Sequence, residues 1–272
     1  MTVRPSLKEV MARYNLLPKK SLGQNFLLDE NITQKVAKAA GKLNGHRIIE
    51  IGPGPGGLTR SILDLGADEI IAIEMDKNCI LALESLCDPR LTVLHQDALK
   101  TDFVSLFQTD KPVKIVANLP YNIGTELLFK WLPAINKIES LTLMFQKEVV
   151  DRIIAAPSTK DYGRLSVMVQ WLAAAKKSFD LAPHLFTPPP KVTSSVVHII
   201  PKDQILSVNF NVMEKLVKQA FSQRRKMLKS TLKEFINSDT FAQADIDPTR
   251  RAETLSIQEF VRLAELYHVS SP

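Results

Sequence analysis

The sequence predicts an α/β fold, a doubly wound Rossmann-like sheet followed by a small C-terminal all-helical domain. Between Ile48 and Gln146, short apolar runs rich in β-branched residues alternate with longer segments of helical period, which is the pattern of a parallel sheet covered on both faces. A glycine-rich turn follows the first of these runs, and strand-like runs stop after Pro201. We therefore expect a sheet domain over residues 1–201 and a helical domain over residues 202–272.

The strands of this sheet are expected where the apolar runs are shortest and most β-branched. The predicted strands are Ile48–Ile51, Ile70–Glu74, Thr92–Gln96, Lys114–Ala117 and Leu141–Phe145. Helices are expected to begin near Leu58, Asn78 and Thr125. In such sheets, ligands bind beyond the carboxyl ends of the strands, so the residues that follow each strand are the candidates for a site.

Further helices and strands are expected before and after these five strands in the sequence. Before the first strand, Asp29 is placed to cap a helix over residues 30–40 that ends at Gly41. After the fifth strand we expect helices over 147–156 and 163–174, then final strands over 178–181 and 194–200. Three prolines, at 188–190, predict an extended loop before the last strand.

Helical signals dominate the end of the chain. Residues 212–236 carry apolar side chains at helical spacing. Asp247-Pro248 offers an N-cap followed by proline at the first helical position, and Ser256 with Glu259 offers a capping box for a last helix.

Composition places the chain among ordinary globular proteins. Of its 272 residues, 45% are hydrophobic and 24% charged, and none of its apolar stretches approaches the ~20 residues of a membrane span. The first 20 residues lack the apolar core of a secretory signal, so we expect a cytoplasmic protein without a membrane partner. Neither the two cysteines nor the five histidines have metal-ligand spacing, and we expect no metal.

A basic segment suggests a polyanionic partner. The net charge is +6, and seven cations with no acid lie between Lys215 and Lys233. Arg224, Arg225 and Lys226 are consecutive within this segment, and we expect them to contact RNA phosphates. A solvated helix face is the plainer alternative for the same charges.

The turn after the first strand resembles a cofactor loop. Gly52, Gly54 and Gly57 satisfy the dinucleotide pattern, which also arises by chance, and a P-loop is excluded because no Lys-Ser or Lys-Thr follows. Glu74, at the end of the second strand, is placed to accept hydrogen bonds from ribose hydroxyls, as in enzymes that use NAD or S-adenosylmethionine. Asp97, after the third strand, could accept from an adenine amino group, although a turn-forming role explains it as well.

The fourth strand distinguishes these cofactors, because it ends in Asn118-Leu119-Pro120-Tyr121. Transfer of a methyl group to the N6 atom of adenine needs hydrogen-bond acceptors, since the N6 lone pair is conjugated into the ring. The Asn118 side-chain oxygen and the Pro120 carbonyl could accept the two N6 hydrogens, and Tyr121 could stack on an extruded base. The alternative is a strand closed by a simple Pro-Tyr turn.

In order and spacing, these motifs resemble the KsgA family, the ribosomal small-subunit RNA adenine dimethyltransferases, over essentially the full length. The resemblance rests on Leu22–Leu27, Glu50–Gly54, Glu74, Asp97, 118–121, Phe186–Val192 and Ala220–Lys226. It implies that Asn25 and Leu27 touch the cofactor together with Gly52, Gly54, Glu74, Asp97 and Asn118. It further implies that Phe186 closes the base pocket opposite Tyr121, and that the helical domain binds RNA.

The resemblance also implies the reaction. S-adenosylmethionine would donate methyl groups to two adjacent adenosines near the 3′ end of 16S rRNA during ribosome biogenesis, and S-adenosylhomocysteine would be released. The partner would be the small ribosomal subunit, and we expect the chain to act as a monomer. The alternatives are a large-subunit rRNA adenine methyltransferase of the antibiotic-resistance type, a ribosome-assembly factor in which catalysis is dispensable, and, more remotely, a nicotinamide dehydrogenase.

Overall fold

The computed structural model describes residues 4–19, 22–203 and 208–270, which form two compact units. The first unit comprises Met1–Val150 and Lys176–Pro201, and the second comprises Asp151–Ala175 and Lys202–Pro272. The division of the domains at residue 201 stays a prediction, and the second compact unit also takes in residues 151–175. Within the described ranges, no helix combines the length and the apolar character that a membrane crossing requires.

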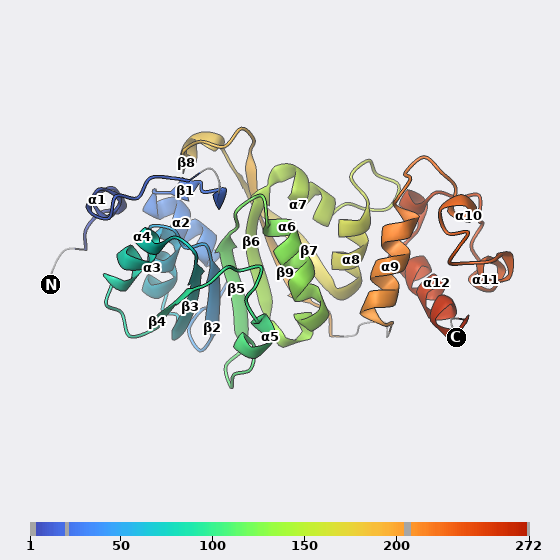
Figure 1. Cartoon of the computed structure of the whole chain (residues 1–272), viewed down its shortest axis with the longest axis horizontal. Coiled ribbons are helices and arrows are strands. Elements are labelled where there is room, and N and C mark those ends of the chain that lie inside the picture. The colour runs from blue at the N-terminus through green and yellow to red at the C-terminus, as the bar shows by residue number, and fades with distance from the viewer. Residues whose placement is uncertain (1–3, 20–21, 204–207, 271–272) are drawn as a thin grey trace. The chain divides into compact units, whose positions relative to one another are not determined.

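The first unit is built on a mostly parallel sheet with the strand order β4-β3-β2-β5-β6-β9-β7 (Figure 1). The strands are β2 (Arg47–Ile51), β3 (Glu69–Glu74), β4 (Leu91–His95), β5 (Val113–Asn118), β6 (Ser140–Gln146), β7 (Ala173–Leu181) and β9 (Ser194–Pro201). Strands β2 to β6 pair in parallel, whereas β9 runs antiparallel to β6. The predicted doubly wound fold and its strands are confirmed. Because β2, β3, β4 and β5 are parallel, their carboxyl ends meet at one edge of the sheet.

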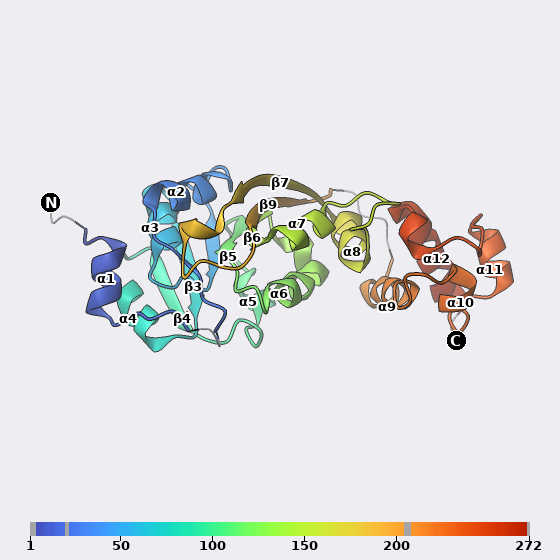
Figure 2. The ribbon, with the colours of Figure 1, turned by 90° about the horizontal axis from the view of Figure 1, so that it is seen from above.

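Both faces of the central strands β2, β3, β5 and β6 are buried, which explains their continuous apolar runs. Alternate strand residues on one face, including Ile48, Ile70 and Val116, form a hydrophobic cluster with α2 (Glu30–Lys38) and α3 (Gly57–Asp64). These two helices pack side by side (Figure 2). The intervening residues, such as Ile49 and Ile115, point to the opposite face and are also fully buried.

The predicted helices begin where the capping residues indicate. Asp29 Oδ1 accepts hydrogen bonds from the backbone N–H groups of Asn31 (2.8 Å) and Ile32 (3.3 Å), and Gly41 beyond the end of α2 has φ +73°. Helices α3, α4 (Lys77–Glu84) and α6 (Gly124–Trp131) each begin within one residue of the predicted start.

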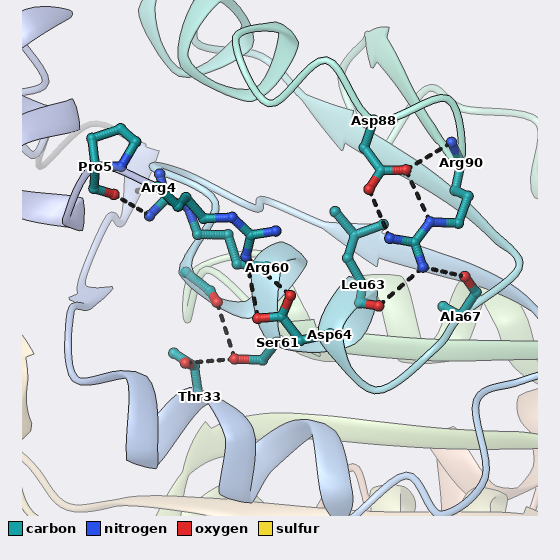
Figure 3. Close-up of polar contacts among 11 residues, drawn as sticks. Arg4, Pro5, Thr33, Arg60, Ser61, Leu63, Asp64, Ala67, Asp88 and Arg90 are labelled. Atoms are coloured by element: carbon teal, nitrogen blue, oxygen red, sulfur yellow. Dashed lines mark hydrogen bonds and ion pairs between the residues drawn. The ribbon is translucent and has the colours of Figure 1, made fainter. Parts of the chain in front are cut away.

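Helix α3, which starts directly after the glycine-rich turn, is bonded to the N-terminal segment by one part-buried and one exposed polar contact (Figure 3). The buried guanidinium of Arg60 donates to the Pro5 carbonyl at 2.6 Å, and Arg4 pairs with Asp64 at 3.1 Å. On the neighbouring helix, Thr33 accepts a 2.8 Å hydrogen bond from the Ser61 hydroxyl. The helix that supports the glycine turn is therefore held from two sides. Helix α1 (Leu7–Arg13) follows Arg4 and Pro5 directly in the chain.

Two very short strands form a second sheet that the sequence did not predict. Strand β1 (Phe26–Leu27) pairs antiparallel with β8 (Phe186–Thr187), so that Leu27 lies opposite Phe186. Strands of two residues show no alternation of apolar and polar side chains, and periodicity cannot detect them. Their pairing brings the N-terminal motif to the loop that contains the three prolines.

The second unit is helical. Its helices α8 (Arg164–Leu172), α9 (Phe210–Ala220) and α12 (Ile257–Ser270) pack against one another. The Phe221 ring lies between Tyr162 and Phe260, with centroids at 6.1 and 5.8 Å. The predicted capping box is present, because Ser256 and Glu259 each accept a hydrogen bond from the other's backbone N–H. The second unit also contains α10 (Leu228–Thr231), α11 (Ser238–Gln243) and the 3-10 helix η4 (Ala252–Thr254). The first unit also contains α5 (Phe103–Leu106) and the 3-10 helices η2 (Leu132–Lys137) and η3 (Pro183–Leu185), and the residues of α7 (Lys147–Ile153) are divided between the two units.

One helical prediction is refined and one is corrected. Residues 212–236 are helical in two pieces with a break between them: α9 ends at Ala220, residues 221–225 form turns, and α10 starts at Leu228. The polar run 222–226 offers no apolar side chain for burial there. No helix begins at Asp247-Pro248, because Asp247 instead accepts hydrogen bonds from the backbone N–H and hydroxyl of Thr249 (2.8 and 2.7 Å) and closes a turn.

Candidate active site

A cavity of about 230 Å³ lies at the carboxyl ends of the parallel strands. It is lined by the residues that follow β2, β3, β4 and β5, and by the N-terminal segment Leu22–Leu27. The predicted site residues that it brings together are Asn25, Leu27, Gly52, Gly54, Glu74, Asp97, Asn118, Pro120 and Tyr121. The cavity therefore lies at the edge of the sheet at which we expected a ligand to bind.

The glycine-rich turn requires glycine at the positions that the motif specifies. Gly52 and Gly54 have φ of +64° and +57°, a conformation that other residues rarely adopt. A Cβ atom on Gly54 would lie 2.8 Å from the Phe26 ring, and one on Gly57 would lie 2.8 Å from the Leu27 carbonyl oxygen. Strand β1 thus lies directly against the turn, and the close approach leaves no room for side chains.

The carboxylate of Glu74 is fixed by backbone hydrogen bonds at the end of β3. Its Oε2 accepts from the Gly54 N–H at 3.1 Å, and its Oε1 accepts from the N–H groups of Met75 and Asp76 at 2.8 and 2.9 Å. Burial raises the pKa of this carboxyl above its ordinary value, although the three hydrogen bonds act in the opposite direction. Glu74 is therefore held at the cavity wall by three backbone hydrogen bonds, and its contact with a ribose stays a prediction.

Glu50 is a site residue whose environment the sequence did not reveal. It lines the cavity, is 1% exposed, and accepts a 2.7 Å hydrogen bond at Oε2 from the Thr59 hydroxyl. Its Oε1 has no partner in the described part of the chain. Burial raises the pKa of the carboxyl to about 8. Its position in the glycine motif was visible in the sequence, but its burial follows only from the packing of β2 and α3.

Asp97 has the turn-forming role that the sequence offered as one of two, and its contact with an adenine amino group stays a prediction. Its Oδ1 accepts a hydrogen bond from the Leu99 N–H at 2.9 Å, which closes the turn after β4. Its Oδ2 has no hydrogen-bond partner among the described residues, and the side chain lines the cavity. One oxygen of Asp97 therefore shapes the turn while the other remains free for a ligand.

The Asn118 side chain is anchored by one end of its amide. Its Nδ2 donates to the main-chain carbonyl of Asn25 at 3.1 Å, and Asn25 in turn donates to the Gly23 carbonyl at 3.3 Å. The Oδ1 of Asn118 accepts no hydrogen bond from the described residues. Asn118 thus presents an unpaired acceptor at the cavity.

The main chain after Asn118 offers a different second acceptor from the one that we predicted. The Pro120 carbonyl already accepts hydrogen bonds from the N–H groups of Ile123 and Gly124, at 3.2 and 3.0 Å, where α6 begins. Both lone pairs of this oxygen are therefore engaged. No backbone hydrogen bond from the described residues ends on the Leu119 carbonyl, and Leu119 also lines the cavity. The Leu119 carbonyl is the better candidate.

Tyr121 is held through its hydroxyl. The Oη atom lies 2.5 Å from Oγ of Ser194, a fully buried residue at the start of β9. Burial raises the pKa of the phenol, so the ring stays neutral. Ser194 gave no signal in the sequence, because only the fold brings β9 beside the turn after β5.

Phe186 does not line the cavity. It is 2% exposed and packs, with Leu27, in the hydrophobic cluster under α2 and α3. In this structure its ring supports β1, and its expected position opposite Tyr121 stays a prediction.

The basic residues of the second unit are not equivalent. Arg224 pairs with Glu253 at 3.0 Å and also donates to the carbonyls of Thr159 and Lys160. Arg225 and Lys226 are exposed, and neither forms an ion pair with the described residues. Arg224 therefore contributes to the packing of the unit, whereas its two neighbours carry no ion pair with the described residues, and contact of all three with RNA stays a prediction.

The described residues contain no group of three or more His, Cys, Asp or Glu side chains that could hold a metal ion. Cys79 is buried and Cys87 exposed, and both are free thiols. The absence of a metal stays an expectation.

Comparison with known proteins places this geometry in a family. The family model described as ribosomal RNA adenine dimethylase matches residues 15–268. The ribosomal RNA small subunit methyltransferase A of Allorhizobium ampelinum is 53% identical over 268 residues, covering 96% of this chain and 97% of that protein. The protein of the same name from Agrobacterium fabrum is 51% identical, with 96% of each chain covered.

Solved structures agree with this result. A dimethyladenosine transferase from Plasmodium falciparum superposes with a TM-score of 0.74 at 27% identity, covering 86% of this chain and 94% of the other. The 23S rRNA methyltransferase ErmE, with a TM-score of 0.67 and 24% identity over 90% of this chain and all of its own, shares the fold. A match over nearly the whole chain, with the glycine turn and the Asn118–Tyr121 segment at one cavity, shows that the chain belongs to the ribosomal RNA adenine dimethylase family.

Proposed function

We propose that this chain transfers methyl groups from S-adenosylmethionine to the N6 atoms of two adjacent adenosines near the 3′ end of 16S rRNA. The observation that carries the proposal is the unpaired Oδ1 of Asn118 at the rim of a glycine-lined cavity. The names of the relatives, which act on small-subunit rRNA, support the choice of ribosomal subunit.

The residues of the cavity fit the cofactor. Because Gly52 and Gly54 have no side chains, a ligand can approach the main chain closely at these positions. The Glu74 carboxylate is held where ribose hydroxyls can donate hydrogen bonds to it. The free Oδ2 of Asp97 suits the adenine amino group of the same ligand. S-adenosylmethionine, when bound, supplies the methyl group and is released as S-adenosylhomocysteine.

The acceptors of this chain act on the substrate amino group. Asn118 Oδ1 and the Leu119 carbonyl accept the two N6 hydrogens, which draws the nitrogen out of conjugation and directs its lone pair toward the cavity. Tyr121 stacks on the extruded base, an interaction worth roughly 1–3 kcal/mol. As the new N6–methyl bond forms and the sulfur–methyl bond breaks, the nitrogen becomes cationic, and one of its protons is then lost to water. Catalysis thus rests on orientation and on neutral hydrogen bonds, without a covalent intermediate on the protein.

The test is methyl transfer from labelled S-adenosylmethionine to unmethylated small subunits, large subunits and naked 16S rRNA, followed by mass spectrometry of the nucleosides. We expect dimethyladenosine at two adjacent positions of small-subunit RNA. The control is Asn118→Ala, which should lower the rate about 10²–10³-fold and should still bind S-adenosylhomocysteine in calorimetry.

Other results would favour the alternatives. Label confined to large subunits would identify the antibiotic-resistance type of enzyme. If Asn118→Ala restored every defect of a deletion strain, binding to the ribosome rather than methylation would be the function that matters. Action as a monomer in the cytoplasm stays part of the proposal, and sedimentation of the purified chain tests the oligomeric state.

A further inference from the structure

The N-terminal segment Leu22–Leu27 lies between the two halves of the site. On one side, Phe26 and Leu27 pack against the glycine turn, within 2.8 Å of where Cβ atoms of Gly54 and Gly57 would lie. On the other side, Asn25 accepts the hydrogen bond from Asn118, and Gly23 lies against Asn122. The segment that lines the cofactor cavity is therefore also in contact with the turn that receives the base.

The contact with Asn25 determines which atom Asn118 presents to the base. A main-chain carbonyl can only accept a hydrogen bond, so the atom of the Asn118 amide that faces it must be Nδ2. The oxygen is then directed away from Asn25. If the amide turned over, it would present its donor group to the N6 hydrogens of adenine, and methyl transfer would lose its acceptor.

Gly23 lies close to the turn that follows Asn118. It has φ +64°, and a Cβ atom there would lie 2.6 Å from Oδ1 of Asn122 and 3.5 Å from Cβ of Pro120. The segment is also attached at its outer end, where Lys19 pairs with Asp76 at 2.7 Å and its N–H donates to the Gln24 side chain at 2.9 Å. A methyl group at Gly23 must therefore displace the exposed side chain of Asn122, and it also strains a positive-φ backbone only two residues from the Asn25 carbonyl.

We propose that the segment Leu22–Leu27 is a positioning element of the catalytic turn, in which the Asn25 main-chain carbonyl sets the orientation of the Asn118 amide and Gly23 sets the distance. This inference rests on the proposed function and adds a role to residues expected only to touch the cofactor.

The experiment compares Gly23→Ala with Gly45→Ala. Both glycines have positive φ, at +64° and +84°, so both substitutions introduce the same kind of backbone strain. Only the first brings a methyl group against Asn122, because nothing lies within 4 Å of a Cβ atom at Gly45. The measurements are the single-turnover rate of methyl transfer to small subunits at saturating S-adenosylmethionine, the Kd of S-adenosylhomocysteine by calorimetry, and thermal unfolding.

We expect Gly23→Ala to lower the single-turnover rate about 100-fold, to change the Kd less than about threefold, and to unfold at the same temperature as Gly45→Ala. The double variant Gly23→Ala/Asn122→Ala lacks the obstructing side chain. Its single-turnover rate should be at least about tenfold higher than that of Gly23→Ala. Gly45→Ala should be as active as wild type.

The positioning role would be overturned if Gly23→Ala were as active as Gly45→Ala, if its Kd rose as much as its rate fell, or if the double variant recovered nothing. A wild-type chain that methylates no RNA would contradict the proposed function itself. The two failures are therefore distinguishable within one set of measurements.

Discussion

The hydroxyls of Tyr121 and Ser194 lie 2.5 Å apart, although 72 residues separate them in the chain. Tyr121 follows β5, and Ser194 begins β9, opposite Gln146 of β6. The hydrogen bond fixes the tyrosine ring at its far end while the Leu119–Pro120 turn fixes it at the near end. The stacking platform proposed for the base is thus attached to two different parts of the sheet.

Ser194→Ala should release the Tyr121 ring and lower the rate of methyl transfer about tenfold, because an ordered stacking partner contributes roughly 1–3 kcal/mol. Cofactor affinity should not change. The matched control is Ser195→Ala, which also removes a hydrogen bond from a fully buried serine, the 2.6 Å bond to Asp180, but does not contact Tyr121. Equal rates in the two variants, measured with small subunits, would show that the hydroxyl contact does not position the ring.

Glu50 should make the stability of the chain depend on pH. Because the pKa of this carboxyl rises from 4.5 to about 8 on folding, the folded state keeps a proton that the unfolded state has released between these values. Its stabilising contribution is complete below pH 4.5 and is lost as the pH rises through 8.

The measurement for Glu50 is urea unfolding of wild type and Glu50→Gln at several pH values between 5 and 8. The free energy of unfolding of wild type should fall relative to that of the variant, by at most about 1.4 kcal/mol per pH unit. Parallel curves for the two proteins would contradict the raised pKa, and the comparison cancels the contributions of other carboxyls such as Glu74.

Substitution of Arg225 and Lys226 together by Ala should weaken RNA binding, because both side chains are exposed and have no ion-pair partner among the described residues. Each lost phosphate contact should reduce the slope of log K against log salt by about 0.7–0.9. Cofactor affinity should be unchanged.

Arg224→Ala is the control for this pair. Since Arg224 is paired with Glu253 and bonded to two carbonyls, its loss should lower the melting temperature more than it lowers RNA affinity. Filter binding at several salt concentrations, together with thermal unfolding, separates the two effects. An unchanged salt slope in the Arg225/Lys226 variant would remove these residues from the interface.

Lys114→Met should destabilise the first unit without affecting methyl transfer. This lysine is 5% exposed, donates to the carbonyls of Ala40 and Lys42 at 3.0 and 2.8 Å, just beyond the end of α2, and pairs with Glu139 at 3.2 Å. Its loss leaves these carbonyls without the donor, at a cost of about 2 kcal/mol. Lys111→Met, which removes a more exposed cation 3.8 Å from Glu69, should cost less than about 1 kcal/mol. Urea unfolding of both variants checks the difference.

The sequence was sufficient for those parts of the molecule in which local pattern and burial agree. The β-branched runs predicted the strands β2 to β6 to within about two residues, and Asp29, Ser256 and Glu259 formed the expected caps. Prediction failed where tertiary contacts decide: the two-residue strands β1 and β8 have no period, and Asp247 closes a turn because its carboxylate bonds to Thr249.

The sequence by itself determined the doubly wound sheet, the edge at which the ligand residues gather, and the identity of most residues at the cavity, because in a parallel sheet each strand delivers its next residue to the same edge. Only the tertiary structure decided how these residues are held. It paired Asn118 with the Asn25 carbonyl, occupied the Pro120 carbonyl with the start of α6, and joined Tyr121 to Ser194. Such contacts depend on distances of a few tenths of an ångström between distant segments, which no local pattern in the chain encodes.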